Sequence, residues 1–379
     1  MEIGSIMSFK IDFENFSQQM IPTLTTELIG HFSIDGDSQY HDNLSQLKYY
    51  IPPSDPDNVN FDLDKNYVST RHKSNSHIKL DNILKWISDN FFRLEKSLAE
   101  EDCWLGVDFI CSRGAIKTIL SSPYKERDEW IICASKYHGT IYLCEFYTDE
   151  KEHSYANRTM LKKRYNSWGY KFEQYMVADH PAHKPDPSRA LNECEEFHCM
   201  FKAKFDNHSL LYAAEIDGIF SQQFIKDTLI GNTFEIIELK TIVISDKHGN
   251  GNMYGKVHHE LVSSWWSQNY LLELNRIICG LRDRNGTVTM IKEYNLHNLP
   301  KLSNSPYNVD KCKIFLKIFL NEIKKIVIKD YNKCMYKFHW KPSTKNVINY
   351  SEEAPDNEKY DFLKPWYIDK VEQYRKQPQ

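Results

Sequence analysis

The stretch that decides the fold is Ala214-Glu215-Ile216-Asp217-Gly218, followed further along the chain by Glu235-Ile236-Ile237-Glu238-Leu239-Lys240. Both segments lie in apolar, β-rich runs that predict strands. Because successive side chains of a strand point to opposite faces, Glu215 and Asp217 share one face, and Glu238 and Lys240 share another. We therefore expect two neighbouring strands to present these charged groups to a common site.

A further carboxylate, Glu173, closes the segment Gly169-Tyr170-Lys171-Phe172-Glu173, which also reads as strand-like. Several carboxylates held together are unfavourable unless cations balance them, and Mg²⁺ or Mn²⁺ would do so through oxygen ligands. Lys240 could then hold an attacking water while two metals stabilise the attacking and leaving oxygens. The pattern predicts a metal-dependent phosphodiester or pyrophosphate hydrolase.

The same triplets also occur by chance. Glu322-Ile323-Lys324 repeats the Glu-x-Lys pattern on an amphipathic helix, where it forms a solvated face. The β-rich context of Glu215 to Lys240 favours the functional interpretation.

Two residues outside these strands are candidates with open alternatives. Gln268 lies on the apolar stripe of Leu261, Trp265 and Leu272, within a helix expected over residues 257–274. It either holds the same water as Lys240 or caps a backbone carbonyl. Arg113, at a strand end, either binds a substrate phosphate through its planar fork or forms a surface salt bridge.

Composition limits the class of protein. The chain has 379 residues, 41% hydrophobic and 26% charged, as expected for a soluble globular protein. Its formal net charge of -4 argues against a protein that coats duplex DNA by overall charge, although Lys162-Lys163-Arg164 is either a local basic funnel or a solvated turn. The nine cysteines include no C-x-x-C pair and predict reduced core residues. With no apolar stretch long enough for a signal peptide or a membrane span, we expect an intracellular protein.

The pattern predicts one domain, residues 1–379, with an irregular N-terminal segment (1–75) and a charged, loosely held C-terminal tail (352–379). Its fold class is α/β (α+β), with mixed, largely antiparallel sheets flanked by helices. Expected helices cover residues 80–98, 114–120, 257–274 and 312–328. Expected strands cover residues 104–111, 130–135, 140–146, 197–205, 210–220, 234–245, 276–281 and 287–294, with a final strand around Phe338 and Trp340. Three prolines make residues 179–187 a loop.

The ordered motifs resemble those of the DXO/Rai family of RNA 5′-end decapping enzymes, and the chain looks like a fungal-type member. The resemblance is carried by Arg113 before a short helix, the segment ending in Glu173, Glu215-Ile216-Asp217, Glu238-Leu239-Lys240 and Trp265-Trp266-Ser267-Gln268. The loop with Asp186-Pro187-Ser188-Arg189 also fits. The resemblance to the family covers residues 80–340.

This resemblance implies a core like that of PD-(D/E)xK nucleases and an RNA 5′-end hydrolase. Such enzymes remove 5′-triphosphate, unmethylated-cap or NAD-cap ends, and some continue with 5′–3′ exonuclease action. It implies RNA as the partner, with neither DNA nor membrane. As an alternative, it implies a nuclear protein that binds and stimulates a large 5′–3′ exoribonuclease, with catalysis secondary.

The resemblance also implies roles for single residues. The metal ligands would be Glu173, Glu215, Asp217, Glu238 and Leu239, holding Mg²⁺ or Mn²⁺ as two ions. The catalytic residues would be Glu215, Asp217, Glu238, Lys240 and Gln268, with Lys240 and Gln268 positioning the attacking water. Arg113, Lys240 and Gln268 would contact the substrate.

Overall fold

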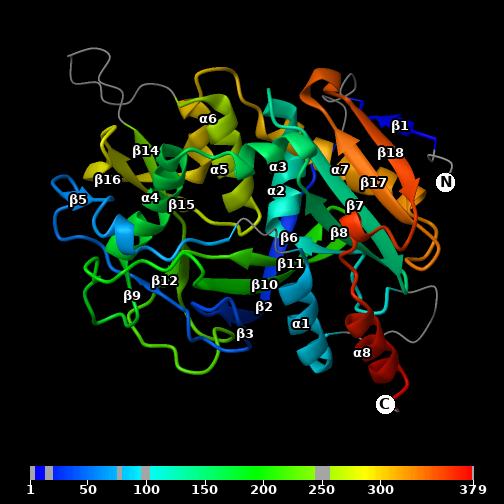
Figure 1. Cartoon of the computed structure of the whole chain (residues 1–379), viewed down its shortest axis with the longest axis horizontal. Helices are drawn as coiled ribbons and strands as arrows, with labels where there is room; N and C mark the ends of the chain where they lie inside the picture. The colour runs from blue at the N-terminus through cyan, green and yellow to red at the C-terminus, as the bar shows by residue number, and fades with distance from the viewer. Residues whose placement is uncertain (1–4, 13–19, 75–78, 95–102, 244–256, 378–379) are drawn as a thin grey trace.

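The computed structural model describes residues 5–12, 20–74, 79–94, 103–243 and 257–377 (Figure 1). Ten strands form the largest sheet, in the order β1-β18-β17-β7-β8-β6-β11-β10-β2-β3. Only β8–β6 and β6–β11, at its centre, pair in parallel. This confirms the predicted mixed, largely antiparallel architecture. The strands are β1 Met7–Lys10, β2 Leu24–Ile34, β3 Tyr40–His41, β6 Phe109–Ser112, β7 Trp130–Tyr137, β8 Thr140–Phe146, β10 Glu196–Phe205, β11 His208–Glu215, β17 Met335–Trp340 and β18 Val347–Glu353.

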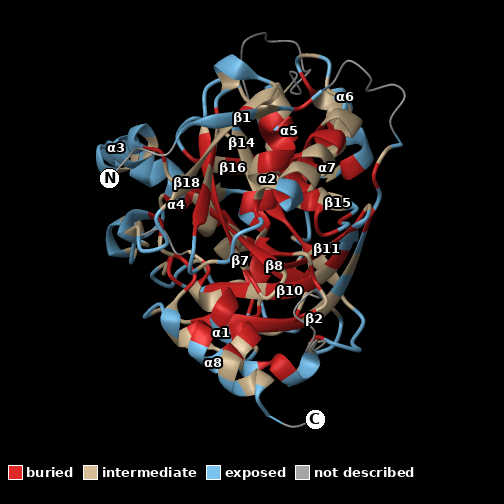
Figure 2. Ribbon diagram, turned by 90° about the vertical axis from the view of Figure 1, so that its right-hand side faces the viewer, coloured by how far each residue is buried: buried red, intermediate tan, exposed pale blue. Residues whose placement is uncertain are grey.

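The alternation of β11 shows how this sheet is covered on both faces. Leu210 and Tyr212 belong to one hydrophobic cluster, and Leu211 and Ala213 belong to another. Helices α2, α5 and α7 lie over the first face, and α1 and α8 lie over the second (Figure 2). These helices are α1 Asp81–Asp89, α2 Arg113–Ser121, α5 His259–Tyr270, α7 Val309–Ile326 and α8 Pro365–Arg375.

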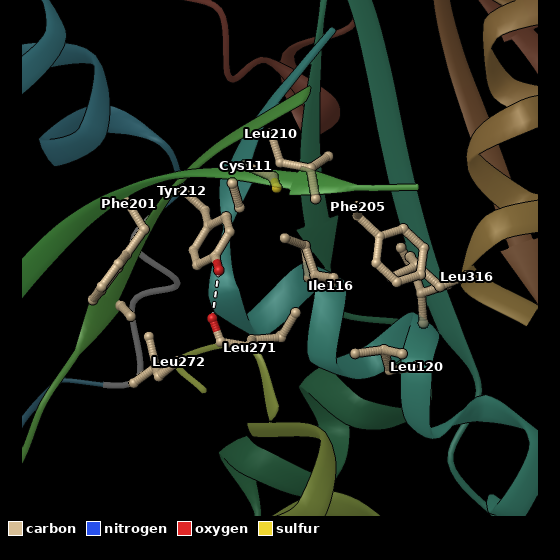
Figure 3. Packing of buried hydrophobic residues seen from close by; sticks show 14 of the residues in the cluster. Cys111, Ile116, Leu120, Phe201, Phe205, Leu210, Tyr212, Leu271, Leu272 and Leu316 are labelled. Carbon is tan, nitrogen blue, oxygen red and sulfur yellow. Dashed lines mark hydrogen bonds between the residues drawn. The ribbon is translucent and has the colours of Figure 1, made fainter. Parts of the chain in front are cut away.

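Figure 3 shows the first face from close by. Ile116 and Leu120 of α2 lie beneath the sheet near Phe205, and the hydroxyl of Tyr212 donates to the backbone carbonyl of Leu271, just after α5. A buried tyrosine thus finds its acceptor at the end of the helix that carries Gln268.

Two smaller sheets adjoin the large one. The second has the order β13-β12-β4-β9, and the third has the order β14-β15-β16-β5. Their strands are β4 Tyr49–Tyr50, β5 Phe61–Asp62, β9 Val177–Ala178, β12 Gly218–Phe220, β13 Glu235–Ile237, β14 Leu239–Val243, β15 Arg276–Arg282 and β16 Thr287–Asn295. The remaining helices are α3 Asp149–Ala156, α4 Met160–Met176 and α6 Leu299–Leu302.

The chain changes sheets at two neighbouring points. It leaves the large sheet after Glu215 and enters the second at Gly218. It leaves the second sheet after Ile237 and enters the third at Leu239, so the strand predicted over residues 234–245 is broken at Glu238. Since Gly218 pairs with Ile237, the two crossing points lie side by side.

The prediction of an irregular N-terminal segment was wrong. β2 pairs along its length with β10, from Leu24 opposite Phe205 to Ile34 opposite Glu196. The partner strand lies far away in the sequence, and neither a hairpin turn nor a clean alternation marks residues 24–34. Tertiary pairing decides the strand here.

The prediction of a loose C-terminal tail was also wrong. After β17, the strand β18 adds to the sheet, and α8 buries Tyr367, Ile368 and Val371 in the cluster that includes α1. Polar residues around these positions hid the helix, whose apolar side is narrow.

Smaller corrections concern element ends. The strand expected from Trp104 begins only at Phe109, because Trp104 lies in a turn. Leu261, expected on the buried stripe of α5, is 36% exposed, whereas its neighbour Val262 is buried. The helix expected over residues 80–98 ends at Asp89 and is followed by a 3₁₀ turn, Phe91–Arg93. Residues 95–98 of that helix, and residues 244–245 of the strand expected over 234–245, lie outside the described residues. The other predicted helices and hairpins are present, with ends shifted by a few residues. Where the structure describes the chain, its helices are either too short or too polar to cross a membrane.

Candidate metal-dependent active site

Arg113 is fixed where β6 passes directly into α2. Ser112 caps the helix, since its hydroxyl accepts from Ala115 N–H at 3.2 Å. Arg113 follows as the first helical residue and is buried. Its Nη2 donates to the backbone carbonyl of Glu215 at 2.7 Å, and its Nη1 lies 3.4 Å from Oε2 of Glu238. The guanidinium therefore joins both crossing points rather than forming a surface salt bridge.

A second contact ties the crossing points together. Asp217 Oδ2 accepts from the backbone N–H of Leu239 at 2.6 Å. On the other side, the carbonyl of Glu238 accepts from Ile278 N–H of β15 at 3.0 Å. Because the N–H and C=O of one strand residue point to the same edge, the Leu239 carbonyl also lies on the Asp217 side. Of the groups of Leu239, this carbonyl is the one that could ligate a metal, because the side chain is a hydrocarbon and is buried in the apolar cluster with α4.

Glu238 is the centre of the polar network and is fully buried. Its Oε1 accepts from Lys240 Nζ and from Gln268 Nε2, and its Oε2 faces Arg113. Three donors from β14, α5 and α2 therefore meet on one carboxylate, which offsets the cost of burying its charge. Of the two open interpretations of Gln268, the carbonyl cap is wrong, because its amide reaches into this network.

Glu173 reaches the site from a helix, not from a strand. It lies near the end of α4, whose residues Trp168, Phe172 and Met176 pack against β14, β15 and β16. The preceding Gly169-Tyr170-Lys171 segment is helical too, so its apolar character was misread as strand-like. Period 3.6 and period 2 cannot be told apart in so short a motif.

The carboxylates have unequal proton affinities. Burial, followed by Asp217 and Glu215, raises the pKa of Glu173 well above its usual range. Burial, followed by Glu238, raises the pKa of Asp217 to about 7. Burial also opposes ionisation of Glu238, but Lys240 and Arg113 outweigh it and lower its pKa. The site thus has more negative charge than its own cations neutralise, as expected of a site for divalent ions.

Two adjoining cavities open beside Glu173, Glu215 and Asp217, whereas Glu238 and Lys240 lie behind them and line neither cavity. The acidic chamber, about 610 Å³, is lined by seven carboxylates (Glu173, Asp179, Asp186, Glu195, Glu196, Glu215, Asp217) against Lys48, Lys184 and Arg189. The cationic chamber, about 700 Å³, is lined by Lys73, Lys79, Arg113, Lys117 and Arg158 against Glu193, Glu196 and Glu215. Tyr170, Glu196 and Glu215 line both, so the chambers meet beside the metal-ligand candidates.

The predicted proline-rich loop forms one wall of the acidic chamber. Lys171 Nζ, buried on α4, donates to the carbonyl of Pro187 at 2.7 Å and to Gln174 Oε1 at 2.8 Å. Loop and helix are therefore held together around the chamber mouth. Of Lys162-Lys163-Arg164, Arg164 pairs with Asp64, and none of the three lines either chamber, so the basic funnel is not formed there.

The four carboxylates offer the oxygen donors that Mg²⁺ and Mn²⁺ prefer. They do not yet form a closed cage, because no three of them bring oxygens within 4.8 Å of one another. Within the described ranges, the group that does so is Glu126, His258 and His259 at the start of α5, which lines neither chamber. The donor set is chemically suited to a divalent cation, but its oxygens are spread more widely than in a closed cage.

Sequence reasoning missed one cation and one aromatic group of the site. Lys117 Nζ donates to Gln268 Oε1 at 3.1 Å, and it stands four residues after Arg113 on α2, a spacing that shares a helix face. Tyr170 lies where the chambers meet, three residues before Glu173. In both cases, helical spacing from a recognised residue was the available signal.

Comparison with known proteins places these features in a family. Residues 25–368 match the family described as RAI1 like PD-(D/E)XK nuclease. The chain is 29% identical over 351 residues to the Decapping and exoribonuclease protein of Bos taurus, covering 91% of this chain and 85% of that protein.

Solved structures agree on the fold. The structure of Candida albicans Rai1 in complex with pU5-Mn²⁺ superposes with a TM-score of 0.75 at 20% identity, covering 93% of this chain and 96% of that one. Scheffersomyces stipitis Rai1 in complex with (3′-NADP)⁺ and calcium ion gives a TM-score of 0.77 at 19% identity, covering 98% and 100%.

Proposed function

Because the chain belongs to the RAI1 like PD-(D/E)XK nuclease family, we propose that its two chambers bind and hydrolyse RNA 5′ ends in RNA quality control. Its relatives carry the name decapping and exoribonuclease protein, and the chain is a hydrolase of that class. One observation supports the site assignment above all others. Asp217 and Glu238, at the two crossing points, meet residues from five separate elements: Arg113 of α2, Glu173 of α4, Glu215 of β11, Lys240 of β14 and Gln268 of α5.

Glu173, Glu215, Asp217, Glu238 and the Leu239 carbonyl would hold Mg²⁺ or Mn²⁺, as two ions. When bound, such ions lower the pKa of a coordinated water and stabilise charge on the phosphoryl oxygens. A precedent for divalent ions is the manganese in the Candida albicans Rai1 complex named above.

The protein's own groups would position the reactants. Lys240 and Gln268, both held on Glu238 Oε1, would fix the direction of the attacking water through their remaining N–H groups. Arg113 would keep its bond to the Glu215 carbonyl and offer its remaining N–H groups to the 5′ phosphate.

Charge gives the substrate a direction. The 5′ phosphates are the most anionic part of the RNA, and the cationic chamber presents Arg113 and Arg158 to them. The acidic chamber repels phosphates and suits the metals instead. RNA 5′ ends with several phosphates therefore fit better than those with one. The substrates would be 5′-triphosphate, unmethylated-cap and NAD-capped RNA, with 5′–3′ degradation following.

The test is the double variant Glu215→Ala with Asp217→Ala. We expect loss of Mn²⁺-dependent product release from 5′-triphosphate RNA by at least about 100-fold, with the thermal unfolding transition retained. The matched control is Glu195→Ala, which removes an exposed carboxylate from the wall of the same chamber without touching the ligand set. Unchanged turnover in the double variant would overturn the assignment.

A panel of RNAs with triphosphate, monophosphate, unmethylated-cap, methylated-cap and NAD ends, run with each metal, would define the preferred end. Single-stranded DNA of the same sequence tests the expected preference for RNA.

We also propose, from the family, that the protein resides in the nucleus. The alternative main function is docking on a large 5′–3′ exoribonuclease, with catalysis secondary. A shift in gel filtration when such a nuclease is added would support docking, and separate elution would argue against it.

A further inference from the structure

We propose that Lys117 is a positioning residue of this site, which holds the side-chain amide of Gln268 in a single orientation. The inference rests on the function proposed above, in which Gln268 directs the attacking water. Lys117 lies one helical turn after Arg113 on α2, and both side chains line the cationic chamber. Its Nζ lies 3.1 Å from Oε1 of Gln268, across the contact between α2 and α5.

The chemistry of the two neighbours fixes which way the amide points. A lysine ammonium can only donate hydrogen bonds, and an ionised carboxylate can only accept them. The amide oxygen of Gln268 must therefore face Lys117, and its nitrogen must face Glu238, as the structure has it. The reverse orientation would set N–H against ammonium and C=O against carboxylate.

This orientation defines which hydrogen-bonding groups of Gln268 remain available to a water molecule. Oε1 keeps one lone pair beyond the bond from Lys117, and Nε2 keeps one N–H beyond the bond to Glu238. A water beside the amide then meets a fixed acceptor and a fixed donor. Without Lys117, a half-turn of the amide would cost less, and the water would lose its direction.

The placement of Lys117 is costly, which argues against an incidental contact. Burial, with Lys240 and Arg113 next in importance, lowers its pKa to about 8. An exposed lysine would avoid this cost. The chain instead holds the amine among other cations, where Gln268 supplies its acceptor.

Substitutions of Lys117 and Gln268, alone and together, test the coupling on 5′-triphosphate RNA with Mn²⁺. Lys117→Met keeps the length of the side chain and should lower kcat about 10- to 100-fold, with KM changed by less than about threefold. Lys117→Arg retains a donor and should restore most of kcat. In the Gln268→Ala background, Lys117→Met should lower kcat no further than about twofold, since its target is gone.

Each other result contradicts the proposal. Additive losses in the double variant, or a rise in KM without a fall in kcat, would mean that Lys117 contacts a substrate phosphate directly. A normal kcat in Lys117→Met would mean that the contact is idle. If Lys117→Met does not fold, Lys117→Ala, which also removes the donor, is compared with Lys117→Arg in its place.

The matched control is Lys125→Met. Lys125 also lowers the pKa of Lys117 through its charge, but it pairs with Asp128 and does not touch Gln268. Basal turnover should be unchanged.

A second readout separates this inference from the proposed function. The side-chain NH₂ resonances of Gln268, assigned by their loss in Gln268→Ala, should shift and broaden in metal-free Lys117→Met and stay sharp in Lys125→Met. If every 5′ end on the panel fails to react, the function is wrong, yet this spectrum still tests the coupling. Unmoved resonances in Lys117→Met would end it.

Discussion

At the residue scale, the unequal carboxylates predict that metal binding releases protons. Burial and neighbouring carboxylates raise the pKa of Asp217 to about 7 and raise the pKa of Glu173 well above its usual range. Metal ligation needs the ionised forms. Manganese affinity should therefore rise with pH through about 7, where Asp217 loses its proton.

Calorimetry at pH 6 in two non-chelating buffers of different ionisation enthalpy measures this release. The apparent enthalpies should differ by the released protons, at about one or more per protein. Glu195→Ala should give the same difference as the unchanged chain. Identical enthalpies in both buffers would show that Asp217 and Glu173 are already ionised.

Sequence reasoning identified the residues of the site better than their surroundings. Glu215, Asp217, Glu238 and Lys240 could be read from two charged triplets in apolar, β-rich runs, although Asp217 and Glu238 lie between strands rather than within them. Glu173 was assigned correctly as a neighbour but wrongly as a strand residue. Lys117 was missed because its role appears only when α2 and α5 are packed together.

At the element scale, the position of Glu173 depends on how closely α4 approaches β15. A Cβ added at Gly280 would lie 2.6 Å from the ring of Phe172, the residue before Glu173. Gly280→Ala should therefore push α4 outward and lower the free energy of unfolding by about 1–3 kcal/mol. Manganese affinity, measured by calorimetry, should fall with it.

The control is Gly169, a glycine of the helix α4 itself. A Cβ at Gly169 meets nothing within 4 Å, and Gly169 lies inside α4. Gly169→Ala should raise the free energy of unfolding by about 0.5–1 kcal/mol, through helix propensity alone. Equal stability of the two variants in denaturant titrations would contradict the close packing of Phe172 on β15.

Elements with local signals were predictable, and elements with distant partners were not. The turn between β7 and β8 uses His138 and Gly139 at positive φ, and the hairpin was expected from its glycine. In contrast, β2 pairs with β10, β4 with β12 and β5 with β16, and in each case the partner lies far away in the sequence. The break at Glu238 was invisible, because apolar residues flank it on both sides.

At the scale of the whole molecule, α8 packs with α1 over the second face of the large sheet. Glu372 of α8 accepts from Tyr137 Oη and lies at the same distance, 2.7 Å, from His138 Nε2, at the turn between β7 and β8. Glu372→Ala should lower the free energy of unfolding by about 1 kcal/mol, since the partners are partly solvated. Amide exchange in α8 should speed up while RNA turnover is unchanged.

The same contact has a pH dependence. Hydrogen bonds from His138 and then Tyr137 lower the pKa of Glu372, so its contribution is present above the unfolded pKa of about 4.3 and is lost as pH falls through the folded value. Glu372→Ala should therefore cost stability at pH 6 and little at pH 3. A cost that does not change with pH would contradict the ionised contact.

The whole fold could be predicted to its class and its core, but not to its ends. The apolar pattern of residues 80–340 predicts the mixed sheet and its helices. Outside or at the ends of that range, β1 and β18 extend one edge of the large sheet, β2 extends the other, and α8 covers one face. The apolar pattern within each of these elements is weak, and each buries its side chains only against elements that lie elsewhere in the sequence.

The hydrogen-bond network around Glu238 limits which substitutions can accompany a loss of catalytic activity in evolution. Glu238 is the common acceptor of a guanidinium, an ammonium and an amide. Replacing this carboxylate would leave all three donors without that acceptor at the crossing points between the sheets. An inactive offshoot that kept only a scaffolding role would have to exchange Arg113, Lys240 and Gln268 as well. Catalytic decay in this lineage should therefore appear as a block of linked replacements rather than as scattered single losses.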